Sequence, residues 1–125
     1  MALTSDVLVI GGGLAGSMAA LAAAREGADV RIVSAAENTL RVATGLIDVL
    51  GYAHRTETDR DSTPLSDPFE AIPDLPAEHP YRTVGVESVR DGLALFDEVT
   101  GENYRGGHTD QNALVTTAGG RVKPT

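Results

Sequence analysis

The stretch that decides the fold is "DVLVIGGGLAGSMAALAAAREGADVRIVSAA", residues 6–36. Residues 6–10 form a short apolar run rich in Val and Ile, which predicts a strand buried on both faces of a parallel sheet. Residues 14–26 contain no proline and carry apolar side chains at helical spacing, which favours a helix. Residues 29–33 predict a second strand. Strand, glycine turn, helix and strand in this order indicate one right-handed βαβ unit and an α/β fold.

Three glycines after the first strand form the pattern G-x-G-x-x-G. Gly11 allows a tight turn, Gly13 lets the backbone approach a diphosphate, and Gly16 lets helix and strand pack closely. A phosphate would lie on the free N–H groups at the positive end of the helix. The alternative is a turn that serves packing alone, but the position between strand and helix favours a Rossmann-like FAD/NAD(P)-binding domain. The residues expected at the cofactor are Gly11, Gly12, Gly13, Leu14, Ala15 and Gly16.

The acidic residue that usually binds the adenosine ribose is missing. It is expected at the end of the second strand, roughly 20 residues after the glycines, where the sequence has Val33, Ser34 and Ala35. Asp29 lies at the wrong end of the strand, and Glu37 lies beyond it. This absence disfavours NAD.

Three cofactor types remain open without that acid. They are FAD with its ribose held by Ser34 or by backbone, a 2′-phosphorylated cofactor bound by Arg31 or Arg41, and a mononucleotide. Solvated arginines are the commoner case at such positions. The following segment, "NTLRVATGLIDVL", places small residues at the sheet edge where the ligand must lie, which favours a flavin. The further cofactor residues expected there are Ser34, Thr39, Thr44 and Gly45.

The rest of the chain divides into segments by composition. Residues 39–52 predict a loop running into a short helix, which completes a flavin-binding unit over 1–52. Residues 53–82 carry five prolines and many charges, so we expect a surface excursion with one helical turn around Phe69 to Ile72. Residues 83–125 predict a helix over 86–100 that Gly101 ends, and then the start of a β-hairpin with Gly119 and Gly120 in its turn. The last eight residues suggest a fragment of a longer chain.

The composition of the chain argues against nucleic-acid binding, cysteine chemistry and a membrane span. The formal net charge of −8 disfavours nucleic acid as a partner. The basic residues are nine arginines and one lysine, and so acidic a surface suits either a salt-rich cytoplasm or an ordinary acidic protein. There is no cysteine, which excludes disulfides and thiolate chemistry and fits a reducing cytoplasm. Residues 7–24 are uncharged, but an acid precedes them and glycines interrupt them, so no membrane span is expected.

No catalytic acid or base stands out. His54, His79 and His108 lie far apart in the sequence, so no metal site is expected. His79 is best interpreted as a hydrogen-bonded turn residue, whereas His108 is a candidate for facing a substrate. Asp48 is expected to cap or to hydrogen-bond within its loop, without a catalytic role.

The chain resembles the B subunit of anaerobic glycerol-3-phosphate dehydrogenase. The matching pieces are residues 6–34, then "TLRVATGLIDVLGY", "HPYRTVGVESVRDGLALF" and "ALVTTAGGRVKPT". The glycine motif is shared by many flavoproteins. The combination of "TGLIDVLGY" with a following "HPY" and its helix is shared by far fewer proteins and is therefore more specific. Members of this family also end the second strand with a hydroxyl residue, as Ser34 does here, and they are several times longer.

The resemblance implies a flavoprotein that acts in the oxidation of sn-glycerol 3-phosphate to dihydroxyacetone phosphate, with electrons passed towards quinone. It implies FMN, with FAD as the main alternative, beside a catalytic, FAD-containing A subunit and an iron–sulfur C subunit that anchors the complex to the membrane. The location would be cytoplasmic, peripheral to the inner face of the membrane through these partners. The rival functions are another FAD-dependent oxidoreductase of the same fold and a non-catalytic flavin electron relay.

Overall fold

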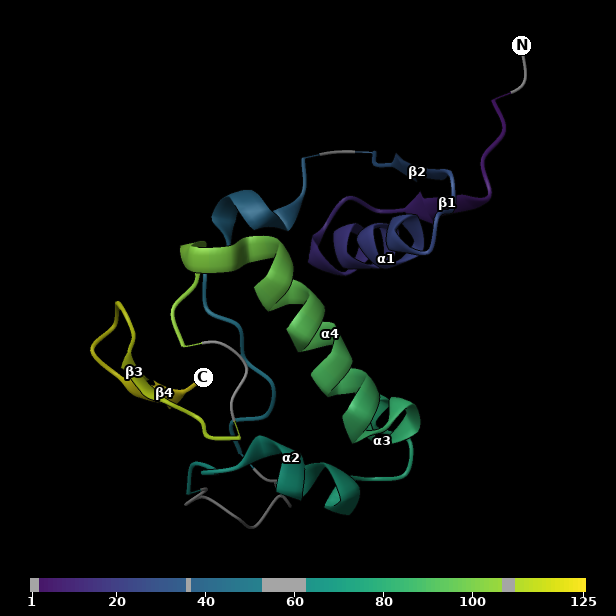
Figure 1. Ribbon diagram of the computed structural model, residues 1–125. Coiled ribbons are helices and arrows are strands. Elements are labelled where there is room, and N and C mark those ends of the chain that lie inside the picture. Colours follow the sequence, from purple (N-terminus) through teal and green to yellow (C-terminus); the bar gives the residue numbers. More distant parts are fainter. Residues whose placement is uncertain (1–2, 36, 53–62, 107–109) are drawn as a thin grey trace. The chain divides into compact units, whose positions relative to one another are not determined.

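The computed structural model describes residues 3–35, 37–52, 63–106 and 110–125 (Figure 1). The chain forms two compact units, Met1–Gly45 and Leu46–Thr125. The first unit contains β1 (Val7–Ile10), α1 (Leu14–Arg25), β2 (Val30–Val33) and the 3₁₀ helix η1 (Thr39–Val42). The second contains α2 (Pro68–Ala71), the 3₁₀ helix η2 (Ile72–Asp74), α3 (Pro80–Val84), α4 (Val86–Thr100), the 3₁₀ helix η3 (Gly101–Asn103), β3 (Leu114–Thr116) and β4 (Val122–Pro124).

The first unit is the expected βαβ unit. Its two strands pair in parallel, with Val7 beside Val30 and Ile10 beside Val33. Both strands and the helix are found within one residue of their predicted bounds. The apolar run, the glycine turn and the alanine-rich segment each favour locally the element that the fold requires at that place. The α/β fold class and the parallel pairing are therefore confirmed.

Burial of β1 differs from the prediction. Val7 and Val9 are half-buried on the side of the strand where α1 packs, whereas Leu8 and Ile10 are 56% and 84% exposed. The prediction that this strand is buried on both faces is wrong for the described residues. Alternate side chains of a strand point to opposite faces, and within this unit α1 covers only one of them.

Small residues let α1 approach the sheet. Ala20 is the one buried residue of the helix, at 7% exposure. One turn earlier, a Cβ built on Gly16 would lie 3.3 Å from Cγ1 of Val9 and only 2.0 Å from the carbonyl oxygen of Gly11. The helix therefore packs through a stripe without large side chains, and the packing role predicted for Gly16 is confirmed.

Prolines begin helices in the second unit instead of excluding them. Pro68 and Pro80 occupy the first positions of α2 and α3, where a missing N–H costs no hydrogen bond. The Asp67 carboxylate accepts hydrogen bonds from the N–H groups of Phe69 and Glu70, at 2.8 and 3.2 Å. The helical turn expected around Phe69 is thus confirmed.

The proline-containing segment also supplies the core of the second unit. Phe69, Ile72 and Leu75 are between 1% and 3% exposed and form one cluster. Val86, Val89 and Leu93 of α4, among others, pack against it. The expectation of a surface excursion is therefore wrong for residues 63–82, because the apolar side chains between the prolines fall on one side of the short helices. Residues 53–62 lie outside the described residues.

The remaining elements, α4 and the hairpin of β3 and β4, agree with the prediction, whereas the segment 39–52 does not. α4 has the predicted bounds, and Gly101, with φ of 53°, ends it. β3 and β4 pair antiparallel as the predicted hairpin, and Gly120 has φ of 76° in its turn. The segment 39–52 departs from prediction, because its helical turn, η1, comes at its beginning and no helix follows it up to Tyr52. The side chain of Asn38 explains the early turn, since its Oδ1 accepts a hydrogen bond from the N–H of Leu40 at 3.0 Å.

Candidate functional site: the glycine turn

The turn from β1 into α1 has the geometry of a phosphate cradle. Gly11 has φ of 111°, which side chains rarely adopt, and its N–H donates to the carbonyl of Val33 at 2.8 Å. This bond places the turn at the carboxyl ends of both strands. That edge of a parallel sheet is where ligands bind in open α/β proteins.

Gly13 leaves space at the helix start. A Cβ built on it meets no atom within 4 Å, so the backbone here is open to close approach. Gly13 is also the N-cap of α1, and no side chain caps the helix. The first turn contains no acidic residue that would neutralise the positive end of the helix. The N–H groups of Leu14, Ala15 and Gly16 therefore suit the oxygens of a phosphate.

Ser34 and Asn38 lie beside the same turn. A Cβ built on Gly12 would lie 3.4 Å from Cβ and 3.6 Å from Oγ of Ser34, and 4.0 Å from Nδ2 of Asn38. Both side chains are exposed. The structure thus brings Ser34 to the glycine turn, as the sequence suggested, and adds Asn38. Asn38 was not among the residues predicted from the sequence, although an Asn directly before a helical turn is a recognisable cap signal.

Some of the other groups considered for a ribose or a 2′-phosphate make contacts of their own. Asp29 directly precedes β2, and its backbone N–H donates to the Asp6 carboxylate at 2.9 Å. Glu37 forms an exposed ion pair with Arg41. Arg31 pairs with Leu8 in the middle of the sheet, and its Nε is buried without a hydrogen-bond partner among the described residues. Asp29 lies before β2 and Glu37 lies beyond it, so neither occupies the end of the strand, where the ribose-binding acid is expected.

Three further predicted residues follow the second strand. Thr39 opens η1, Thr44 is exposed, and Gly45 has φ of 80°, which favours glycine. Their contact with a cofactor stays a prediction. So does that of Gly11, Gly12, Gly13, Leu14, Ala15, Gly16 and Ser34, although their geometry fits a phosphate-bearing group.

The histidines and Asp48 have structural roles where they are described. Nδ1 of His79 accepts from the N–H of Tyr81 at 3.2 Å at the start of α3, as expected of a turn residue. Asp48 bonds outside its loop, to Lys123. Burial raises the pKa of Asp48, but hydrogen bonds from Lys123 and Thr125 and the charge of Lys123 outweigh it, so the pKa lies below its ordinary value. His54 and His108 lie outside the described residues.

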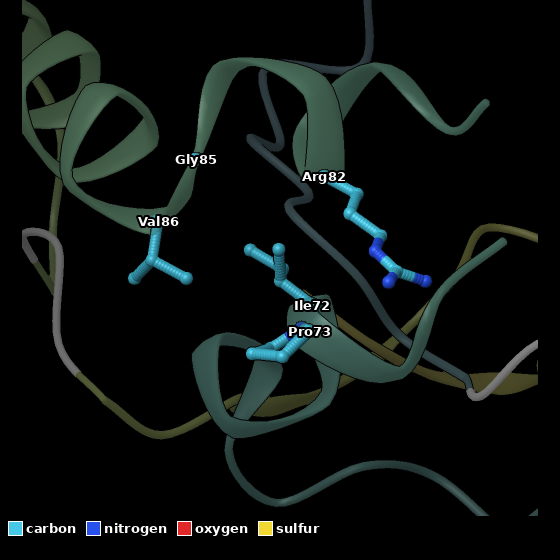
Figure 2. A pocket seen from close by; sticks show the side chains of 5 residues that line it. All are labelled: Ile72, Pro73, Arg82, Gly85 and Val86. Carbon is cyan, nitrogen blue, oxygen red and sulfur yellow. The ribbon is translucent and has the colours of Figure 1, made fainter. Parts of the chain in front are cut away.

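Three other features of the described part of the chain bear on function. Its His, Asp and Glu residues form no cluster that could hold a metal ion. None of its helices is both long and apolar enough to cross a membrane. The second unit has an open cavity of about 310 Å³ (Figure 2), lined by Ile72, Pro73, Arg82, Gly85 and Val86. Arg82, its one charged lining residue, already donates to the carbonyl of Leu75 at 2.7 Å, so the cavity lacks an acid or base for chemistry.

A parallel βαβ unit with an uncapped helix over a glycine turn defines a nucleotide-binding protein of the Rossmann type. Residues 6–125 match the model of the FAD binding domain family, and the chain belongs to this family. The match to this family supports a flavin as the class of cofactor.

The particular relatives are B subunits of anaerobic glycerol-3-phosphate dehydrogenases. The chain is 60% identical over 125 residues to the probable B subunit of this enzyme in Halobacterium salinarum, covering all of this chain and 28% of the relative. It is 38% identical over 94 residues to the B subunit of the enzyme in Vibrio cholerae, and the match covers 73% of this chain and 20% of the relative. The identity to the B subunit of Pectobacterium carotovorum is 37% over 97 residues, and the match covers 75% of this chain and 21% of the relative. The chain thus spans less than a third of these relatives. No solved structure matches it.

Proposed function

We propose that the chain binds a flavin by its phosphate at the glycine turn. The observation that carries this proposal is the open backbone at Gly13, directly before the uncapped start of α1. The N–H groups of Leu14, Ala15 and Gly16 would hold the phosphate oxygens, and Ser34 would add a hydroxyl beside Gly12. A bound flavin supplies hydride and electron transfer, whereas the protein positions and tunes it.

We further propose that the whole protein is a flavin-binding subunit of a quinone-linked anaerobic glycerol-3-phosphate dehydrogenase. The complex would oxidise sn-glycerol 3-phosphate to dihydroxyacetone phosphate and pass two electrons towards quinone. The names of the relatives support this activity. The partners would be a catalytic, FAD-containing A subunit and an iron–sulfur C subunit, with the protein in the cytoplasm at the inner face of the membrane.

FMN is the proposed cofactor, and FAD is the second candidate. FMN has no adenosine ribose, so it needs no acid after β2, and the residue there is Ser34. FAD is the ligand for which the family is named. The variant Ser34→Asp separates the two. A carboxylate beside Gly12 would weaken FMN binding through repulsion of its phosphate, whereas it would give the FAD ribose a hydrogen-bond acceptor. Fluorescence titration of the full-length apoprotein with each flavin measures this difference.

The direct test is the visible absorption spectrum of the full-length protein purified from its host, followed by chromatography of the released cofactor. A yellow protein that releases FMN supports the proposal, and released FAD replaces FMN in it. A colourless protein that binds NADPH tightly would overturn flavin binding.

A non-catalytic electron relay is the second candidate function. Gly12, Ser34 and Asn38, which the structure brings together, supply neither an acid nor a base. Anaerobic addition of sn-glycerol 3-phosphate discriminates the two functions. Bleaching of the flavin in the isolated protein indicates a dehydrogenase, whereas bleaching that requires the catalytic partner indicates a relay. Bleaching by a different small substrate alone would indicate another flavoprotein oxidoreductase.

A further inference from the structure

One face of the two-stranded sheet has no cover within the first unit. α1 packs on the side to which Val9 points (Figure 1). Successive residues of a strand point to opposite faces, and neighbours in a parallel pair share a face. Every second residue of β1 and its partner in β2 therefore point away from α1. We call these residues the open face. They are Leu8, Ile10, Arg31 and Val33.

The open face has the composition of a buried surface. Leu8, Ile10 and Val33 are 56%, 84% and 42% exposed, and Arg31 is its one polar residue. A sheet face that stays in water carries mostly polar side chains, whereas parallel sheets are covered on both faces. Apolar side chains at three of the four positions thus indicate a face that is covered in the complete protein.

Arg31 indicates the chemistry of the cover. It is half-buried, and its Nε is shielded from solvent without a hydrogen-bond partner among the described residues. A guanidinium that loses its water needs oxygen acceptors, and a carboxylate also balances its charge. A cover made of hydrocarbon alone would leave this cation buried and unpaired, which is strongly unfavourable.

The length of the relatives points to the occupant. This chain corresponds to 28% of the Halobacterium relative, so most of such a protein lies outside residues 1–125. A segment of the same chain covers the face without the loss of translational freedom that a separate molecule incurs on binding. A twofold contact between two copies would bring two Arg31 guanidinium groups together, which disfavours a second copy. In the second unit, α4 already packs its apolar side against that unit's own core.

We propose that a segment of the full-length chain outside residues 1–125 covers the open face, with apolar side chains on Leu8, Ile10 and Val33 and a carboxylate paired with Arg31. This segment completes the core of the nucleotide-binding unit on the side opposite α1. Its docking is independent of flavin binding. Arg31 then has a structural role and is not a ligand of a 2′-phosphate.

Photo-cross-linking of the full-length protein identifies the occupant. Benzoylphenylalanine replaces Ile10, the most exposed residue of the open face, and mass spectrometry locates the attached peptide. Attachment to a peptide outside residues 1–125 of the same molecule is the expected result. Attachment to residues 46–125, to a second copy or to another protein would overturn the proposal, and so would the absence of any protein adduct.

Thiol labelling of the full-length protein measures the cover independently. Residues 1–125 contain no cysteine, so Leu8→Cys adds a thiol where the side chain is 56% exposed, and Val84→Cys is the matched control at 55%. A covered thiol reacts only when the cover opens, so Leu8→Cys should react at least about tenfold more slowly in the native than in the unfolded protein. Val84→Cys should be slowed no more than about threefold. A smaller reduction for Leu8→Cys would overturn the cover.

The variant Arg31→Gln, made in the Leu8→Cys protein, tests the carboxylate. Loss of the guanidinium leaves the buried carboxylate unpaired, so labelling at pH 8 should accelerate at least about tenfold. The acceleration, relative to the unfolded rate, should be smaller at pH 5, because protonation removes the unpaired charge. Arg121→Gln, in the exposed hairpin turn, is the control and should change nothing. Unchanged labelling in Arg31→Gln would overturn the pairing, and equal acceleration at both pH values would overturn the carboxylate.

Discussion

Gly16 lies so close to Gly11 that a Cβ on Gly16 would stand 2.0 Å from the Gly11 carbonyl oxygen. Two glycines of one motif are thus in direct contact, and the contact holds the start of α1 against the end of β1. Gly13, between them in the sequence, meets nothing within 4 Å. The same motif therefore contains one glycine that serves packing and one whose open side faces away from the protein.

Substitution of Gly16 by alanine should destabilise the fold. The added methyl group meets backbone and not a flexible side chain, so α1 must move away from β1 at a cost of about 1–3 kcal/mol or more. Urea unfolding of the full-length protein measures this loss, and it should persist when no flavin is present. A variant as stable as the wild type would contradict the observed packing.

Substitution of Gly13 by alanine should affect binding and spare stability. Gly13 has φ of −75°, which alanine adopts readily, so the free energy of unfolding should change by no more than about 0.5 kcal/mol. The methyl group would occupy the face on which a phosphate approaches, and flavin affinity should fall at least about tenfold. Titration with flavin, compared with the unfolding of the apoprotein, separates the two effects. Unchanged affinity would remove Gly13 from the cofactor site.

Substitution of Ile72 by alanine tests the core of the second unit. Ile72 is 1% exposed, and the cavity left by its truncation should cost about 2–5 kcal/mol. Val84→Ala, at a position that is 55% exposed, is the control and should cost at most about 0.5 kcal/mol. Denaturant unfolding compares them. Equal small losses would mean that the proline-containing segment lies on the surface, as the sequence suggested.

The Asp48–Lys123 pair should make stability depend on acid pH. The pKa of Asp48 in the folded protein lies below its ordinary value of 3.8, so ionisation of Asp48 favours folding. This contribution is complete above the unfolded pKa and is lost as the pH falls through the lower folded pKa. Asp48→Asn should therefore be less stable than wild type at pH 7, by at most about 1 kcal/mol because both groups are partly exposed, and the difference should vanish in strong acid.

Unfolding measured from pH 7 downwards tests this dependence. Asp91→Asn, which removes one exposed negative charge from α4, controls for the change in net charge. A stability difference for Asp48→Asn that grows as the pH falls would have the wrong sign and would refute the role of the ion pair.

The sequence by itself determined the elements whose signals are local. The strand, turn, helix and strand of residues 6–33 were predictable because each short segment has a composition that favours its own element. These compositions are the apolar run, the glycine pattern and the alanine-rich segment. The helix over 86–100 and the hairpin turn at Gly120 were predictable for the same reason. The missing acid after β2 was also visible, since the motif fixes its place by counting.

Only the tertiary structure decided which side chains meet. Phe69, Ile72 and Leu75 recur every three residues, but this short pattern between prolines does not show that they form a core, because α4 provides the other half of the cluster. Nor could spacing reveal that Asn38 reaches Gly12, or that Lys123 pairs with Asp48 across 75 positions. Local sequence sets backbone propensity, whereas burial and pairing depend on elements that approach one another only after the chain has folded.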